Sequence, residues 1–278
     1  MRSILVLLGL IVASYPGWGQ TINQFPLLAG SRPAVYGGSS GDLLASGANP
    51  ASLARLRKAG ISLYSEQPYL VPALGRSLLI AACPLASGTL GLTWQQQGRK
   101  AYRESRVGLS YAMRLGGRLE TAVQFNYNRI SITGGYGAAV AVSGEVGVIL
   151  HLTDRLHAGF HMNNPLGGKF GKPALEKLPS IYTAGLAWVC SDRVSLAVEL
   201  QKQENLPPDL ITTLHYRVLD KLELFSGLEA TTPCPWFGTR IRIRSFQLQV
   251  SSGYHLLLGA TPALALVIPF SSGQNEGL

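Results

Sequence analysis

Hydrophobic and polar residues alternate along most of the chain from about residue 60 onward. Every second residue is apolar over 194–200, and the residues between them are small, polar or acidic. Residues 119–128 and 221–229 follow the same alternation. A period of two is typical of a β-strand whose two faces meet different surroundings. We predict about 14 such strands, at residues 59–69, 76–84, 88–97, 103–113, 118–130, 137–152, 155–163, 180–190, 193–203, 208–217, 221–230, 236–244, 246–254 and 262–270.

The predicted strands and their connections have the dimensions of a membrane barrel. Most strands run about nine to eleven residues, which is the length that a tilted transmembrane strand needs. Short turns, such as residues 115–117, alternate with longer joins, such as residues 164–179, as they do at the two rims of outer-membrane barrels. We therefore expect an all-β fold, an antiparallel transmembrane β-barrel of about 14 strands over residues 59–270, followed by a C-terminal tail at residues 271–278.

Composition favours the membrane barrel over a soluble β-sandwich or a periplasmic barrel, which would show the same alternation. Only 14% of the residues are charged, whereas the surface of a soluble protein carries about 25–35%. The polar positions hold mostly Gly, Ser, Thr, Asn and Gln, which suit a crowded, wet interior. Beyond the N-terminal segment no run of 18 apolar residues occurs, so contact with lipid would come through a closed barrel.

The first 58 residues lack the alternation and are expected to have two other roles. Arg2, the apolar residues 4–13 and the small residues near position 19 are typical of a secretory signal. We expect a signal peptide at residues 1–19 and export to the outer membrane. Residues 20–58 are rich in glycine, and Asn49 before Pro50 is a good start for a short helix. We expect this segment to plug the barrel.

Residue types that carry chemistry are sparse. The net charge is +9, which in an exported protein favours anionic lipid headgroups over nucleic acid as partners. Cys83, Cys190 and Cys234 form no ligand spacing. His157 and His161 would lie about 13 Å apart on one strand face, too far for a single zinc ion. No phosphate loop or nucleophile elbow occurs. We expect no metal, no cofactor and no catalysis, with an outer-membrane lipid hydrolase as an alternative.

Charged residues at the polar positions of the predicted strands are expected to point into the barrel. They could neutralise one another as ion pairs, because unpaired charge in a narrow interior is costly, or they could form a field that selects an anionic ligand. We favour the ion pairs, and we then expect Arg242→Ala to lower thermal stability more than it changes permeation. The expected lumen charges are Glu120, Glu145, Glu199, Glu223 and Glu229 against Arg106, Arg240, Arg242 and Arg244.

Three stretches of the chain resemble a known family. Residues 30–53 read GSRPAVYGGSSGDLLASGANPASL, in which a Gly-Gly pair precedes an Asn-Pro-Ala element. With residues 163–207 and 254–268, they resemble the PorV/PorQ-like outer-membrane proteins of Bacteroidota, which look like a branch of the long-chain fatty-acid channel superfamily. The resemblance implies a plugging N-terminal segment. It marks four candidate ligand or plug residues, Gly37, Gly38, Asn49 and Pro50.

The resemblance also implies a function. Relatives of the fatty-acid channels would transport a hydrophobic solute, and relatives of PorV and PorQ would assist type IX secretion. A structural or adhesive barrel is the alternative. Expected partners are outer-membrane lipid and lipopolysaccharide, a hydrophobic small molecule, or components of a secretion system. The loop at residues 164–179, with Lys169, Lys172 and Lys177, could form an exposed binding rim for a secretion role, could bind lipopolysaccharide phosphates, or could have no specific role.

Overall fold

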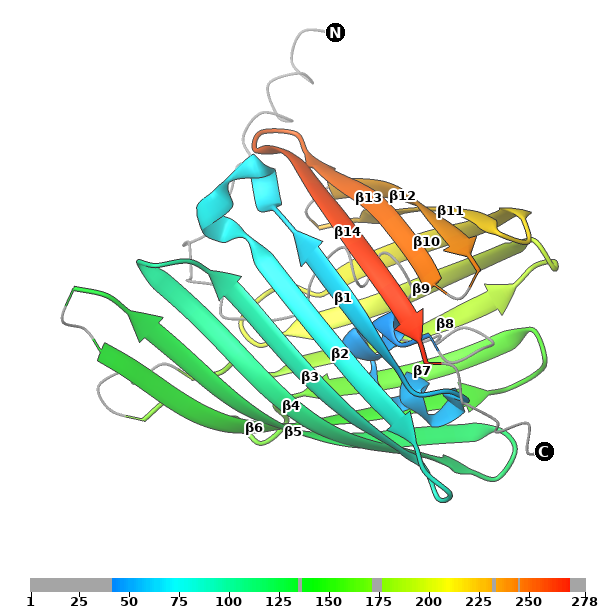
Figure 1. Cartoon of the computed structure of the whole chain (residues 1–278), viewed down its shortest axis with the longest axis horizontal. Helices are drawn as coiled ribbons and strands as arrows, with labels where there is room; N and C mark the ends of the chain where they lie inside the picture. The colour runs from blue at the N-terminus through cyan, green and yellow to red at the C-terminus, as the bar shows by residue number, and fades with distance from the viewer. Residues whose placement is uncertain (1–41, 135–136, 172–176, 232–233, 245, 271–278) are drawn as a thin grey trace, which may run out of the picture.

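The chain forms a closed barrel of 14 antiparallel strands (Figure 1). The computed structural model describes residues 42–134, 137–171, 177–231, 234–244 and 246–270. Each strand pairs with its neighbours in sequence, and β1 closes the barrel against β14. The strands are β1 (Gly60–Glu66), β2 (Arg76–Pro84), β3 (Thr89–Gly98), β4 (Tyr102–Leu115), β5 (Leu119–Ile132), β6 (Gly137–His151), β7 (Leu156–Asn163), β8 (Ile181–Val189), β9 (Val194–Gln203), β10 (Asp209–Leu219), β11 (Leu222–Glu229), β12 (Cys234–Ile243), β13 (Phe246–His255) and β14 (Gly259–Pro269).

The predicted fold class is confirmed, and each predicted segment overlaps one observed strand. The predicted ends fall within three residues of those observed. The strand predicted at 59–69 ends early, at Glu66, because a 3-10 turn, η3 (Pro68–Leu70), follows it. Proline has no N–H to donate to a strand ladder, so Pro68 favours this stop. A second turn, η4 (Pro72–Leu74), completes the connection to β2.

Most apolar positions of the strands face outward and most polar positions face inward, as the alternation and the low charge together predict; Leu78, Ile80, Ile149 and Phe225 are apolar residues that face inward. On β5, Phe125 is 69% exposed, whereas its neighbours Gln124 and Asn126 are buried. The same direction holds around the barrel, which gives a continuous apolar belt of the kind that meets lipid. Other strongly exposed members of this belt are Leu109, Val142, Leu186, Phe237 and Leu264.

Within the described ranges, no helix has the length and apolar character needed to cross a membrane.

Two short 3-10 helices lie inside the barrel (Figure 1). They are η1 (Leu44–Gly47) and η2 (Pro50–Arg55). η2 packs against β3 to β6 and η1 against β1 and β2. Residues 42–58 therefore form the described part of the plug that was expected at 20–58. The helix predicted to begin at Pro50 is present as a 3-10 helix. Residues 20–41, the expected signal peptide and the expected tail at 271–278 lie outside the described residues.

The two rims of the barrel differ. The short-turn rim consists of the connections at residues 85–88, 116–118, 152–155, 190–193, 220–221 and 244–245. The long-loop rim consists of the connections at residues 67–75, 99–101, 133–136, 164–180, 204–208, 230–233 and 256–258. The connections alternate between the rims as predicted, but those at 99–101 and 256–258 are no longer than the turns of the other rim. The longest strands are β4, β5 and β6, with 14, 14 and 15 residues.

Candidate functional site

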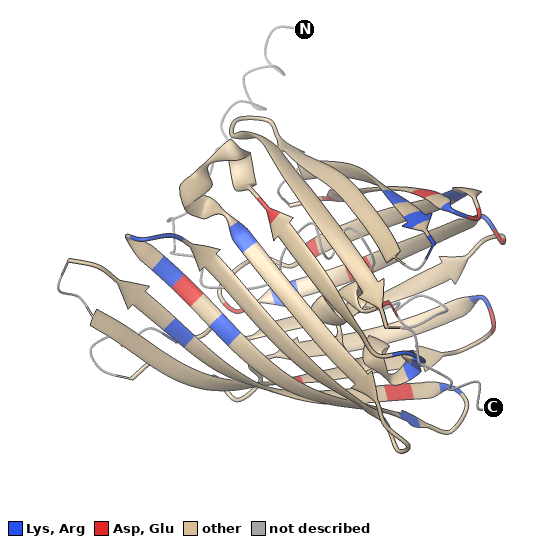
Figure 2. Ribbon diagram, in the orientation of Figure 1, with Lys and Arg blue, Asp and Glu red and all other residues tan. Residues whose placement is uncertain are grey.

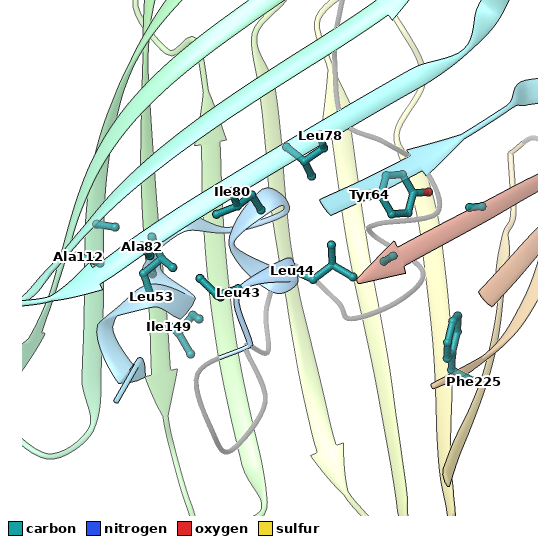
Figure 3. Packing of buried hydrophobic residues seen from close by; sticks show 14 of the residues in the cluster. Leu43, Leu44, Leu53, Tyr64, Leu78, Ile80, Ala82, Ala112, Ile149 and Phe225 are labelled. Carbon is teal, nitrogen blue, oxygen red and sulfur yellow. The ribbon is translucent and has the colours of Figure 1, made fainter. Parts of the chain in front are cut away.

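An apolar cluster inside the barrel packs around the plug (Figure 3). Leu43 and Leu44 of the plug are 2% and 1% exposed, and they belong to one buried cluster with wall residues of β1, β2 and β14. Small residues on the wall let the plug approach closely, since a Cβ on Gly60 would lie 2.9 Å from Leu43 Cδ1. The cluster also contains Leu53, Tyr64, Leu78, Ile80, Ala82, Ala112, Ala122, Ile149, Phe225 and Trp236.

A polar cluster lies on the same wall, over β4 to β7. Arg106 lies 3.3 Å from Glu145 and donates to Asn128 at 2.8 Å. His161 Nε2 lies 3.0 Å from the second oxygen of Glu145, and Asn126 donates to the first at 2.8 Å. The space left between this group and η1 is about 10 Å³, which is at the limit for holding one water molecule. This part of the lumen is therefore filled by its own side chains.

A second polar cluster holds the end of the plug near the short-turn rim. Arg55 donates to Glu120, and His151 Nε2 lies 2.8 Å from the same carboxylate oxygen. The Nδ1 atoms of His151 and His157 lie 2.7 Å apart, a distance at which one proton is shared between them. His157 and His161 share the inward face of β7, as predicted from their spacing. Among the described residues, no three His, Cys, Asp or Glu side chains are placed to hold a metal.

Asn49 connects the plug to the barrel wall. Its Oδ1 accepts from the Ala51 N–H at 3.1 Å and so caps η2. Its Nδ2 donates to the carbonyls of Val148 and Phe160, at 3.5 Å each. A Cβ on Gly147 would lie 2.0 Å from Asn49 Oδ1, so the wall accommodates Asn49 only because position 147 is glycine. Asn49 thus uses its amide oxygen to cap η2 and its amide nitrogen to bond the barrel wall.

Arg240 anchors a third polar cluster on the opposite wall. It donates to Glu223 at 2.9 Å and to Gln249 at 3.0 Å. Asp42, at the start of the described plug, lies 4.0 Å from the Arg240 guanidinium. The plug therefore crosses the lumen, from Asp42 beside β12 to Arg55 beside β5.

The other expected lumen charges have different environments. Glu199 is 1% exposed, and Glu229 is partly buried at the long-loop end of β11. Arg242 is exposed at the short-turn rim, where it lines an open cavity of about 360 Å³. Among the described residues it makes no ion pair. Arg244 was expected to point into the lumen, and that expectation is wrong. It lies in the turn after β12, with φ of 49°, because the strand ends at Ile243.

The remaining candidate residues are divided between the plug and the undescribed N-terminal segment. Pro50 is buried at the first position of η2, where its missing N–H costs no hydrogen bond. Gly37 and Gly38 lie outside the described residues.

The long β7–β8 loop turns back into the barrel at the long-loop rim. Phe170 and Leu178 are each 4% exposed and pack on Ile130, Ala139 and Ala141. The loop is also tied to the wall, since the Gly171 N–H donates to the Val140 carbonyl at 3.1 Å. Lys177, one of the three lysines expected to meet phosphate, donates to Glu204 and holds the pKa of that carboxyl below its usual range. Lys169 is paired to Lys177 by an isolated β-bridge, and Lys172 lies outside the described residues.

Several residues of these clusters were not predicted from sequence. Arg55, Gly147 and Phe170 carry no motif, and each acts through a partner far away along the chain. Gly147 alone carries a usable signal, because it is a glycine at an inward position of a predicted strand. A glycine there indicates a close approach of another backbone or side chain.

Comparisons with known proteins give structural matches only. No family model and no curated protein matches the sequence. Among solved structures, the CymD monoaromatic hydrocarbon channel superposes with a TM-score of 0.64 at 12% identity, covering 80% of this chain and 91% of that one. The Pseudomonas putida toluene transporter TodX superposes with a TM-score of 0.64 at 11% identity, covering 90% of this chain and 99% of TodX. A Pseudomonas aeruginosa FadL homologue superposes with a TM-score of 0.63 at 12% identity, covering 91% of this chain and 100% of the homologue. This chain thus has the fold of these outer-membrane channels.

Proposed function

We propose that the protein is a non-catalytic outer-membrane channel for a hydrophobic solute. The observation that carries the proposal is the apolar cluster of the lumen, where plug residues such as Leu43 and Leu44 pack against apolar wall residues. A pore for ions or sugars would need a polar lining there, because burying a polar solute without hydrogen bonds is costly. Two of the similar structures are a monoaromatic hydrocarbon channel, CymD, and a toluene transporter, TodX, which supports this class of solute.

The space beside Glu145 and His161 is only about 10 Å³, so the solute would follow the apolar cluster when the plug moves. η2 rests against β3, where a Cβ on Gly91 would lie 2.6 Å from Leu53 Cδ1. A disulfide between these two positions would therefore hold η2 against the wall. Cys83, Cys190 and Cys234 are free and would first be replaced by serine.

The test is uptake of radiolabelled toluene or oleate into vesicles that contain the Leu53→Cys/Gly91→Cys variant. We expect uptake to be blocked when the disulfide is formed and restored by reduction. The single variant Leu53→Cys in the same background is the control, and its uptake should not respond to oxidant. Equal uptake by the oxidised and reduced double variant would contradict a route past η2, and no uptake by the unmodified protein would contradict transport itself.

A role as a type IX secretion accessory is the second candidate, and it is supported by the resemblance at residues 30–53 and 163–207 alone. A deletion strain distinguishes the two functions. Loss of growth on a hydrophobic carbon source with an unchanged set of secreted proteins would favour transport. The opposite pattern would favour secretion, and a strain with neither defect would favour a structural or adhesive barrel.

A further inference from the structure

The outward faces of the strands carry very few charges, and those present share a sign and a location. In the described part of the chain they are Arg103, Arg129 and Lys202. All three are cations, and all three lie at the long-loop end of their strands. Acidic residues of the strands face inward. A charge that faces lipid is costly unless it lies at the depth of the headgroups. The three cations are therefore placed to meet lipid headgroups on the long-loop side of the membrane alone.

Arg103 and Arg129 form a pair. Arg103 lies opposite Ser131, and Arg129 lies opposite Ser105, on the shared face of β4 and β5. Such diagonal neighbours lie about 7–8 Å apart. Neither side chain makes a hydrogen bond or ion pair within the described ranges. Figure 2 shows Lys and Arg gathered on β4, β5 and the turn between β3 and β4 at this end.

From the arginine pair toward the short-turn rim, the rows of outward residues change from polar to partly aromatic to apolar, as they do from the headgroups to the hydrocarbon of a membrane. The strand register places Gln96, Ser105 and Arg129 in one row, with Trp94, Val107 and Tyr127 in the next. Leu92, Leu109 and Phe125 form the row after that. Aromatic side chains border the hydrocarbon region of membrane barrels. The arginines therefore lie just beyond the aromatic row, where phosphate groups are found.

The strand length agrees with this depth. The outward apolar stretch of β5 runs from Leu119 to Tyr127. Eight residue steps along a strand tilted near 40° span about 21 Å across the membrane. The apolar band of a barrel is about 25 Å tall, so Arg129 falls at its upper edge and Arg103 falls above it.

We propose that this outward face of β4 and β5, the Arg103–Arg129 surface, binds the phosphate groups of a lipid of the lipid A type. Two unpaired guanidinium groups side by side repel each other, and a phosphate between them accepts paired hydrogen bonds from both. The acyl chains then run down the apolar rows that begin at Val107 and Tyr127. The long-loop rim faces outward from the cell in such barrels, and phosphorylated lipopolysaccharide is the lipid of that leaflet. This binding surface does not depend on which solute the lumen carries.

The test compares lipid binding by two double variants of the full-length mature protein in detergent. Arg103→Gln/Arg129→Gln removes the pair, and Arg57→Gln/Arg114→Gln removes two exposed cations near the short-turn rim. Binding of bisphosphorylated lipid A is followed by native mass spectrometry and by the increase in melting temperature. We expect the first variant to bind at least about tenfold more weakly than the unmodified protein, and the second to bind normally.

Three further results complete the test. Lipid A without phosphates should bind weakly to every form, and phosphatidylglycerol should bind less tightly than lipid A. Arg103→Lys/Arg129→Lys, which keeps the charge but loses the paired geometry, should be intermediate, and it also serves if the glutamine variant does not fold. Equal lipid A affinity in both double variants, or equal affinity for phosphatidylglycerol and lipid A, would overturn the proposal.

Discussion

At the scale of single residues, position on a strand face does not fix the role of a charge. Arg240 and Arg242 both lie on the inward side of β12, two residues apart. Arg240 is 3% exposed and contacts Glu223 and Gln249, whereas Arg242 lies in the open cavity of the short-turn rim. The loss of thermal stability that was expected for Arg242→Ala is therefore expected for Arg240→Ala instead.

We expect Arg240→Ala to destabilise the barrel by about 3 kcal/mol, because it leaves the Glu223 carboxylate without its buried cation. Arg242→Ala should change stability by less than about 0.5 kcal/mol, as surface substitutions do. Urea unfolding in micelles, followed by the heat-modifiable gel band, measures both. Adding Glu223→Gln to Arg240→Ala should recover part of the loss, and a purely additive double variant would argue against the pair.

At the scale of elements, η2 is held in place by a close fit to β6. Gly147→Ala places a methyl group 2.0 Å from the present position of Asn49 Oδ1, so either the plug or the strand must shift. We expect a loss of about 1–3 kcal/mol, as for other overpacked sites. Gly144→Ala on the same strand is the control, since its Cβ would meet only the Gln124 carbonyl, at 3.8 Å.

The same fit predicts coupling between two residues that lie far apart in the chain. Asn49→Ala removes the cap and should cost about 1 kcal/mol alone. In that background Gly147→Ala should cost clearly less than in the unmodified protein, because the clashing amide is gone. A Gly147→Ala penalty that is unchanged by Asn49→Ala would show that the amide contact does not position the plug.

The β7–β8 loop is a second element whose position depends on one side chain. Phe170 is 4% exposed against Ile130, Ala139 and Ala141, and Phe170→Ala removes most of that buried surface. We expect the loop to detach from the long-loop rim, with faster tryptic cleavage after Lys169 or Lys177 at nearly unchanged barrel stability. Leu166→Ala in the same loop, where the side chain is 91% exposed, should cleave like the unmodified protein.

The elements differ in how far the sequence could predict them. Alternation is a local signal, and therefore it located each strand, whereas the low content of charged residues indicated which face points outward. Asn49 before Pro50 is also local, and it correctly placed the start of η2. The contact of Asn49 with Val148, and the return of Phe170 onto Ile130, join segments with no pattern in common. Such contacts depend on the closed register of the barrel, which no local pattern specifies.

At the scale of the whole molecule, the barrel has three distinct surfaces. The outer belt is apolar, an apolar cluster inside the barrel surrounds Leu43 and Leu44, and polar clusters inside the barrel surround Glu145 and Arg240. A soluble barrel has only an apolar interior and a charged exterior. The apolar outer belt therefore requires lipid, whereas the apolar cluster of the interior is covered by the plug.

The requirement for lipid can be tested at one position of the belt. Phe125 is 69% exposed near the middle of β5, so Phe125→Arg places a charge at the depth of the acyl chains and should cost about 2–4 kcal/mol in a bilayer. Leu257→Arg changes a residue that is 90% exposed in the β13–β14 loop and should cost almost nothing. The measurement is the folded fraction after refolding into lipid vesicles over a urea series. If Phe125→Arg refolds as well as Leu257→Arg, or keeps the protein dispersed without detergent, the belt faces water and the barrel is not a membrane protein.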